Sequence, residues 1–241
     1  MLRLKKTYEY EWPRPAVTVD VVLFTVAGAL AEMRLQVLLV RRKGEPLRGW
    51  WALPGGFVRE SEDLPDAAAR ELKEETGVTG AFLEQVTAVG TPGRDPRGHT
   101  VTVVWMGLVP GERHQLAASG DAAAVGWFDV AGPAPLPRLA FDHAALLQAG
   151  LDHLRRRVSE APLCFELLPD EFTLSELQAL LEAILGRTLD RRNFRRKVEE
   201  IGILAPVPDA RREGAHRPAQ LYRYVPAAFA AYTAKARLLP F

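Results

Sequence analysis

Cysteine is nearly absent from this chain of 241 residues, in which Cys164 is the single thiol. One cysteine cannot form a disulfide within the chain, and this excludes a small secreted fold held together by disulfides. Because Cys164 lies in the apolar run APLCFELL, we expect a small core residue rather than a nucleophile. The cysteine usage favours a reducing compartment, the cytoplasm.

Long apolar runs and a strong charge of one sign are also missing. No segment is as long and apolar as a transmembrane span, and polar residues separate the basic start MLRLKK from the apolar VVLFTVAGALA, unlike a signal peptide. The net charge is only +1, so no global field indicates a partner. Residues 1–154 hold 16 basic and 19 acidic side chains, whereas residues 155–241 hold 15 and 11. We therefore expect no membrane partner and two halves with different roles.

The first part of the chain alternates strand patterns with a few helical ones, which predicts an α+β fold. Strands are predicted at 16–26, 35–42, 81–90, 99–109 and 123–130, and helices at 63–77 and 141–158. Asp63 is the expected N-cap of the first helix and Gly77 its C-terminal stop. Residues 43–56 are expected to form a loop.

The second part changes character after a proline-rich break. Helices are predicted at 172–186, where Thr173 and Glu176 form a capping box, and at 191–202, followed by two short strands around a basic tip. Helix, tight turn, helix and hairpin is the order of a winged helix-turn-helix. We predict a first domain over residues 1–155, with its core at about 15–135 and a linker helix at 141–158, and a second domain over residues 159–241.

Three glutamates lie close together in the segment RELKEETG. On a helix at about 100° per residue, Glu71, Glu74 and Glu75 share one arc while Lys73 points away. Carboxylate oxygens suit Mg²⁺ or Mn²⁺, ions that also bind substrate phosphates. Taken alone, such a pattern is more typical of a solvated acidic helix face.

The surroundings of these glutamates fill every fixed position of the Nudix box. The matching residues are Gly56, Glu62, Arg70, Glu71, Leu72, Glu74, Glu75, Gly77 and Val78. The chain thus resembles Nudix proteins over roughly residues 15–135. The resemblance implies an α/β/α sandwich with a mixed sheet.

The same resemblance implies a divalent-metal site that holds a diphosphate. Its metal ligands, and the catalytic residues of a hydrolase, are Glu71, Glu74 and Glu75, joined as ligand by the backbone carbonyl near Gly55. The residues implied to orient the motif rather than touch substrate are Gly56, Glu62 and Arg70. The implied chemistry is attack of a metal-activated water on a nucleoside diphosphate derivative. A further glutamate that some Nudix enzymes carry on a later loop is not identified, because Asp95, Glu112 and Asp121 match no motif.

The segment RRNFRRK holds five basic residues in seven. A stripe of Phe194, Val198 and Ile201 is expected to be buried, so that Arg192, Asn193, Arg195 and Arg196 face away from it. Arginine suits phosphates and guanine edges, and asparagine suits adenine. The alternative is a solvated helix in which Glu199 and Glu200 pair with Arg195 and Arg196. The helix-turn-helix order and the basic wing favour DNA.

The two halves together resemble the Nudix-related regulators of NAD metabolism, the NrtR family. The segments that carry this resemblance are GRDPRGHTVTV, LAFDH, ILGRTLDRRNFRRK and HRPAQLYRY. It implies a homodimeric repressor that binds double-stranded DNA and leaves its operator when the Nudix domain binds ADP-ribose. Arg94 and Arg97 are the implied effector contacts. The implied DNA contacts are Arg192, Asn193, Arg195, Arg196, Lys197 and Arg217.

Two other functions stay open on the sequence. Because the Nudix box is complete, hydrolysis is retained as an alternative, namely an ADP-ribose pyrophosphatase whose C-terminal domain serves dimerisation. A regulator that responds to a sugar derivative is the second alternative. His99, His143 and His153 lack metal-ligand spacing and are expected to be structural or surface residues.

Overall fold

The computed structural model describes residues 9–111, 116–211, 219–234 and 239. One long strand lies at the centre of the first part of the chain. β1 (Ala16–Ala27) is buried continuously from Thr18 to Thr25 because both of its faces are covered. It lies at the centre of a sheet in the order β3-β2-β1-β6-β5, with β4 paired to β1 and β7 to β2. The other strands are β2 (Arg34–Arg42), β3 (Trp51–Ala52), β4 (Gly55–Phe57), β5 (Phe82–Val89), β6 (Thr100–Leu108) and β7 (Ala122–Asp129).

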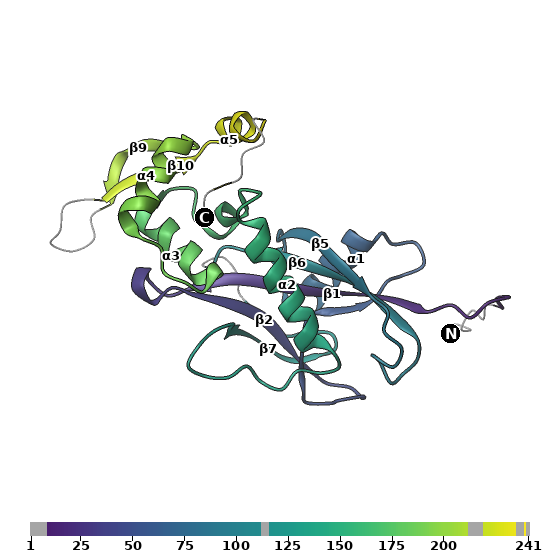
Figure 1. The fold of residues 1–241 in the computed structure, drawn as a ribbon. Helices are drawn as coiled ribbons and strands as arrows, with labels where there is room; N and C mark the ends of the chain where they lie inside the picture. The colour runs from purple at the N-terminus through teal and green to yellow at the C-terminus, as the bar shows by residue number, and fades with distance from the viewer. Residues whose placement is uncertain (1–8, 112–115, 212–218, 235–238, 240–241) are drawn as a thin grey trace.

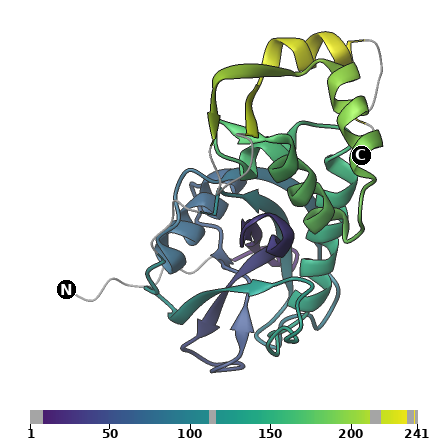
Figure 2. The same ribbon diagram turned by 90° about the vertical axis from the view of Figure 1, so that its left-hand side faces the viewer.

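The sheet is mixed and lies between two helices, as Figures 1 and 2 show. β1 runs parallel to β6, and the remaining pairs are antiparallel. α1 (Leu64–Thr76) covers the face that carries Val19 and Val21, while α2 (His143–Arg157) covers the face of Val22 and Phe24. This alternation along one strand gives the α/β/α layers, and the predicted fold class is confirmed.

The strands and helices predicted from periodicity are found within two residues at each end. Asp63 caps α1 by accepting a hydrogen bond from the Leu64 amide at 2.8 Å, and Gly77 ends the helix with φ of 80°. The predicted loop at 43–56 is partly wrong, because it contains β3 and β4. β3 pairs with β2 and β4 with β1, where the two long strands diverge. Strands of two or three residues are too short for a periodic signal.

The C-terminal part is a winged helix built on α3 and α4. Its three-stranded sheet has the order β8-β10-β9, and the predicted capping box joins Thr173 and Glu176 at 2.7 and 3.1 Å. A short helix, α5, follows the wing and buries none of its residues. The bounds are η1 (Leu30–Glu32), η2 (Leu163–Leu167), β8 (Phe172–Thr173), α3 (Leu174–Leu185), α4 (Arg191–Ile201), β9 (Leu204–Arg211), β10 (Ala219–Tyr224) and α5 (Pro226–Thr233).

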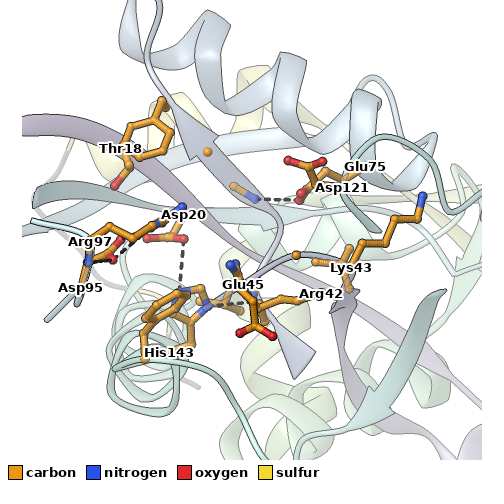
Figure 3. Close-up of a pocket in the computed structure, with 18 of the residues that line it drawn as sticks. Thr18, Asp20, Arg42, Lys43, Glu45, Glu75, Asp95, Arg97, Asp121 and His143 are labelled. Atoms are coloured by element: carbon orange, nitrogen blue, oxygen red, sulfur yellow. Dashed lines mark hydrogen bonds and ion pairs between the residues drawn. The ribbon is translucent and has the colours of Figure 1, made fainter. Parts of the chain in front are cut away.

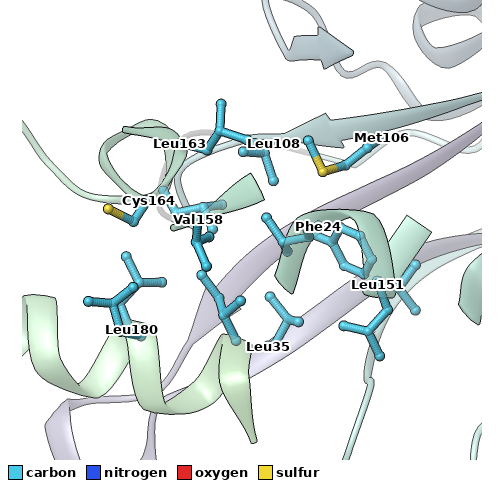
Figure 4. Packing of buried hydrophobic residues seen from close by; sticks show 14 of the residues in the cluster. Phe24, Leu35, Met106, Leu108, Leu151, Val158, Leu163, Cys164 and Leu180 are labelled. Atoms are coloured by element: carbon cyan, nitrogen blue, oxygen red, sulfur yellow. The ribbon is translucent and has the colours of Figure 1, made fainter. Parts of the chain in front are cut away.

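The hydrophobic core continues from the sheet into the winged helix (Figure 4). Leu180 of α3 belongs to the same buried cluster as Leu35 of β2 and Leu151 of α2. Cys164 lies in this cluster, where burial raises the pKa of its thiol to about 12, so it acts as the expected core residue. No helix among the described residues has the length and apolar character needed to span a membrane.

Candidate functional site

A cavity of about 200 Å³ opens where β1 and β2 diverge (Figure 3). Its walls come from β1, β2, β4, the C-terminal turn of α1, the loop between β5 and β6, the residue before β7 and the start of α2. Side chains of both signs meet there, among them Asp20, Arg42, Lys43, Glu75, Arg97 and Asp121. A mixed polar lining of this kind suits a small ligand that carries charge and hydroxyl groups.

Arg70 provides the positive charge among the box glutamates. Its guanidinium donates to both oxygens of Glu62 at 2.5 and 2.7 Å, to Glu71 at 2.5 Å and to Glu74 at 3.2 Å. The hydrogen bonds from Arg70 lower the pKa of Glu62 to about 2. Arg59 donates to Glu74 at 3.1 Å as well. Two guanidinium groups therefore bind these three carboxylates.

Gly56 lies where β4 closely approaches the Glu71 side chain of the glutamate helix. A Cβ atom at this position would lie 2.6 Å from the carboxyl carbon of Glu71. Such a contact is well inside van der Waals distance, so any side chain would force the carboxylate away. The absence of a side chain at Gly56 thus allows the Glu71 carboxylate to lie directly against β4.

Glu75 is the box glutamate that lines the cavity. It is buried, and its Oε2 accepts a hydrogen bond from the Gly55 amide at 3.0 Å. Its pKa is raised to about 7, mainly by burial and in part by the nearby carboxylates of Glu71, Asp121 and Asp20, while the hydrogen bond from Gly55 acts to lower it. A cation at this position would stabilise the ionised form of the buried Glu75 carboxyl group, which lies among other acids.

The donor chemistry of the three glutamates fits Mg²⁺ or Mn²⁺, although the present side-chain positions do not yet form a cage. Glu71 and Glu74 bond to arginines, Glu74 is 46% exposed, and Glu75 alone faces the cavity. Among the described residues no three His, Cys, Asp or Glu side chains gather closely enough to hold an ion. Metal binding would require these carboxylates to turn from the arginines toward Glu75.

We expect the metal-free protein to lose stability as the pH rises, because of Glu75. Its folded pKa of about 7 lies above the ordinary value of 4.5, so the folded state keeps a proton that the unfolded state releases. The contribution is present below pH 4.5 and is lost as the pH rises through 7, up to about 3 kcal/mol. Urea unfolding in a chelator at pH 5 to 8 measures it, with Glu75→Gln as the control that lacks this slope. Equal slopes in the two proteins would contradict the expectation.

The two arginines predicted as effector contacts occupy different positions at the cavity. Arg94 is buried and donates to both oxygens of Asp142 at 2.9 and 2.8 Å, at the start of α2. Arg97 has 43% of its side chain exposed, pairs with Asp95 at 2.6 Å and lies 5.2 Å from the Phe57 ring. Arg97 is accordingly the more accessible of the two, whereas Arg94 holds α2 against the cavity.

Several cavity residues escaped the sequence analysis. Phe141 has a φ of 53°, a left-handed conformation that bulky residues rarely adopt, and it brings its ring within 4.8 Å of the Arg42 guanidinium. His143, expected to be structural, lines the cavity, accepts a hydrogen bond from the Leu53 amide at 2.9 Å and has a pKa lowered by burial. The feature of the sequence that could have indicated this cavity was Asp20, an acidic residue inside an apolar strand. Asp95 and Asp121 reach the cavity, while Glu112 lies outside the described residues.

The predicted recognition helix is α4. Phe194 and Val198 are buried as expected, and Ile201 is half-buried. Arg196 donates to Glu200 at 3.0 Å and to Asn193 at 2.8 Å, so one of the two intrahelical ion pairs weighed from the sequence is present.

The remaining candidates for DNA contact differ in exposure. Arg192 is exposed, while Arg195 is half-buried and lies 3.5 Å from the Ser175 hydroxyl of α3. The half-buried Lys197 lies on the same helix. Arg217 falls outside the described residues. α4 therefore presents Arg192, Asn193 and Arg196 outward, with Arg195 closer to the body of the winged helix.

Two known protein families match different parts of the chain. Residues 14–149 match the family described as NUDIX domain, and residues 164–224 match the family described as NrtR DNA-binding winged helix domain. Over 216 residues the chain is 38% identical to the ADPR responsive transcriptional repressor NtrR of Acinetobacter baylyi, which covers 89% of this chain and 84% of that protein.

Solved structures also resemble this chain in sequence and fold. The crystal structure of Shewanella oneidensis NrtR complexed with a 27mer DNA is 34% identical, has a TM-score of 0.74 and covers 93% of this chain and 97% of that one. A cocrystal structure of its NUDIX domain with ADP ribose, also 34% identical, has a TM-score of 0.52 and covers 61% and 94%. A Francisella tularensis NMN adenylyltransferase/ADP ribose pyrophosphatase complexed with AMP and a Mn ion is 25% identical, with a TM-score of 0.50, and covers 60% and 43%.

Proposed function

This chain belongs to the NrtR family, in which a Nudix domain precedes a DNA-binding winged helix, and we propose that it is a transcriptional repressor controlled by ADP-ribose. The proposal depends mainly on one observation: the domain with the charged cavity and the domain with the basic helix share one continuous hydrophobic core. By the same resemblance, the genes that it represses are proposed to serve NAD metabolism. We propose that it acts in the cytoplasm, where a repressor can reach its operator.

The effector is proposed to bind in the cavity between β1 and β2. Arg97 is the accessible cation beside the aromatic ring of Phe57, and Arg42 and Lys43 add positive charge on β2 and just after it. Arginine matches the oxygens of a diphosphate in geometry as well as in charge. Arg94 is proposed to contribute mainly through Asp142, because its guanidinium is already engaged there.

Helix α2 connects this cavity to the DNA-binding part. Asp142, directly before α2, pairs with Arg94 at the cavity, and Arg155 near the other end donates to the Ile184 carbonyl at 3.0 Å, in the last turn of α3. Between these ends α2 packs in the shared core. A ligand that moves Arg94 would shift a rigid helix that contacts the winged helix, which gives a physical route for coupling.

The DNA-binding unit is proposed to be a homodimer that presents two copies of α4. Arg192, Asn193 and Arg196 are exposed on this helix, and Lys197 and the half-buried Arg195 add charge. Paired helices in successive major grooves would read two half-sites about one helical turn apart. Arg217 of the wing is proposed as a further contact, from the resemblance alone.

The test is a DNA-binding assay with duplexes taken from upstream of the protein's own gene and its neighbours. We expect a salt-dependent complex that ADP-ribose, but not AMP or ribose 5-phosphate at the same concentration, dissociates. Absence of a complex at low salt would refute the repressor function. Release by a sugar phosphate in place of ADP-ribose would favour the sugar-responsive alternative.

Hydrolysis of ADP-ribose is a second candidate function, favoured by the complete set of box glutamates, of which Glu75 lines the cavity. A bound Mg²⁺ or Mn²⁺ would lower the pKa of a water and neutralise the diphosphate. Glu71, Glu74 and Glu75, with the Gly55 carbonyl, are proposed to hold the ion, while Arg70 and Glu62 orient the helix. The plain hydrolase alternative would use the winged helix for dimerisation only.

A double variant tests this second function. If the chain hydrolyses ADP-ribose, Glu74→Gln/Glu75→Gln should lower Mg²⁺-dependent AMP release at least 100-fold, because it removes two anionic ligands. Chromatography of the nucleotide after incubation measures AMP. Glu182→Gln, on α3, is the matched control and should keep wild-type turnover. Unchanged release in the double variant would remove both glutamates from the mechanism.

A further inference from the structure

Thr18 at the wall of the cavity carries a hydroxyl that nothing in the described structure satisfies. Its side chain lines the cavity and the residue is only 7% exposed. Thr18 Oγ1 is buried and has no hydrogen-bond partner among the described residues. Leaving a buried hydroxyl unpaired costs free energy, and such groups in a pocket wall indicate a partner supplied by a ligand.

Asp20 lies two residues further along β1 and therefore projects from the same face of the strand. Its Oδ2 accepts a hydrogen bond from the Thr102 hydroxyl at 2.6 Å. Oδ2 also lies 3.6 Å from the Arg94 guanidinium, and Oδ1 lies 3.6 Å from His143 Nε2, which is beyond hydrogen-bond distance. Oδ1 thus keeps acceptor capacity toward the cavity.

Two neighbours keep this oxygen open to a ligand. Gly55 passes so close that a Cβ atom would lie 2.9 Å from Asp20 Oδ1, so the absence of a side chain leaves the oxygen uncovered. His143 Nδ1 accepts the Leu53 amide, and burial lowers the pKa of the ring. The proton of the neutral imidazole is consequently on Nε2, and His143 lies beside Asp20 as a neutral ring that is too distant to donate a hydrogen bond to Oδ1.

The charged groups around Thr18 and Asp20 restrict what can bind there. Figure 3 shows Arg97, which pairs with Asp95, on the same side of the cavity as these two residues, and Lys43 and Glu75 on the other. A carboxylate repels phosphate and accepts hydrogen bonds from hydroxyls, whereas Arg97, Arg42 and Lys43 attract phosphate. From this arrangement we propose that Thr18 and Asp20 form the subsite for the hydroxyls of the effector's terminal sugar. This inference rests on the proposed ADP-ribose function and assigns the part of the ligand that distinguishes ADP-ribose from ADP.

The test compares two ligands that differ only in the terminal ribose group. Full-length wild type, Thr18→Val and Thr18→Ser are titrated with ADP-ribose and with ADP by calorimetry, in a chelator that prevents metal-dependent turnover. Wild type should bind ADP-ribose more tightly than ADP. Thr18→Val, which replaces the hydroxyl by a methyl group of similar size, should weaken ADP-ribose about five- to tenfold and change ADP less than about twofold. Thr18→Ser restores a hydroxyl and should bind ADP-ribose within about twofold of wild type.

Other outcomes overturn the subsite. Equal weakening of both ligands by Thr18→Val would assign Thr18 to the base or the phosphates, and unchanged binding of both would make its hydroxyl irrelevant to the ligand. Wild type that binds ADP no less tightly than ADP-ribose also overturns it. DNA release is measured separately with the same proteins. If the protein binds ADP-ribose more tightly than ADP but ADP-ribose does not release DNA, the repressor function is refuted and the subsite stands. If ADP-ribose releases DNA but binds Thr18→Val as tightly as wild type, the subsite is refuted and the repressor function stands.

Discussion

Replacing Arg192 and Arg196 together by alanine is expected to weaken operator binding about 100-fold or more. Both arginines are exposed on α4, and Arg196 is held by Asn193 and Glu200 in a position that faces away from the buried stripe. An arginine contact with a base edge or phosphate contributes about 1–3 kcal/mol, and a dimer loses each contact twice. Titration of a labelled duplex at several salt concentrations measures both the loss and the reduced salt slope.

Arg34→Ala is the matched control for this pair. Arg34 has 48% of its side chain exposed and lies 3.3 Å from Asp129 on the Nudix part. Its removal changes the net charge without touching α4, so operator affinity should stay within about threefold of wild type. The double variant should still bind ADP-ribose as wild type does, because no cavity residue is altered. Equal losses in the control and the double variant would mean that overall charge, rather than α4, determines the affinity.

Removal of the Arg70 guanidinium is expected to lower the melting temperature of the metal-free protein by about 5 °C. Arg70→Ala leaves Glu62, Glu71 and Glu74 with mutual repulsion in place of four charge-assisted hydrogen bonds. Mg²⁺ should recover part of the loss if these carboxylates can turn to a divalent ion, since a ligand bound by the folded state stabilises it. Calorimetry with a chelator and then with Mg²⁺ measures both effects.

Two further variants separate charge from geometry at this site. Arg70→Lys keeps the positive charge but lacks the planar fork, and its melting temperature should lie between those of wild type and Arg70→Ala. Lys73→Ala removes an exposed cation from the same helix and should shift the melting temperature by less than about 2 °C. If Lys73→Ala and Arg70→Ala melt at the same temperature, the network around Arg70 has no special role in stability.

The features predicted well from sequence are those encoded over a few neighbouring residues. Asp63 and Gly77 bound α1, and Thr173 caps α3, because caps depend on side chains within one turn of the helix end. The buried positions Phe194 and Val198 followed from helical periodicity. The short strands β3 and β4 were missed, because two or three residues carry no period.

The arrangement of the site depended on contacts between distant parts of the chain. Arg94, expected to contact the effector, lines the cavity and bonds to Asp142, 48 residues further along the sequence, a partner that the sequence did not indicate. Thr18 and Asp20 attracted no functional interpretation as members of an apolar strand, and only the divergence of β1 and β2 turns them into a cavity wall. Spacing in the sequence does not reveal such neighbours, since they are created by strand order and register.

The sequence by itself determined the family resemblance, the acidic helix and the basic helix, because each is a local pattern of fixed spacing. The tertiary structure decided which groups those helices meet. It places Arg59 and Arg70 against the box glutamates and buries Glu75 beside Gly55. It also joins the Nudix sheet and the winged helix in one core. Burial and opposite charge at short distance set these properties, and both arise only when the chain has folded.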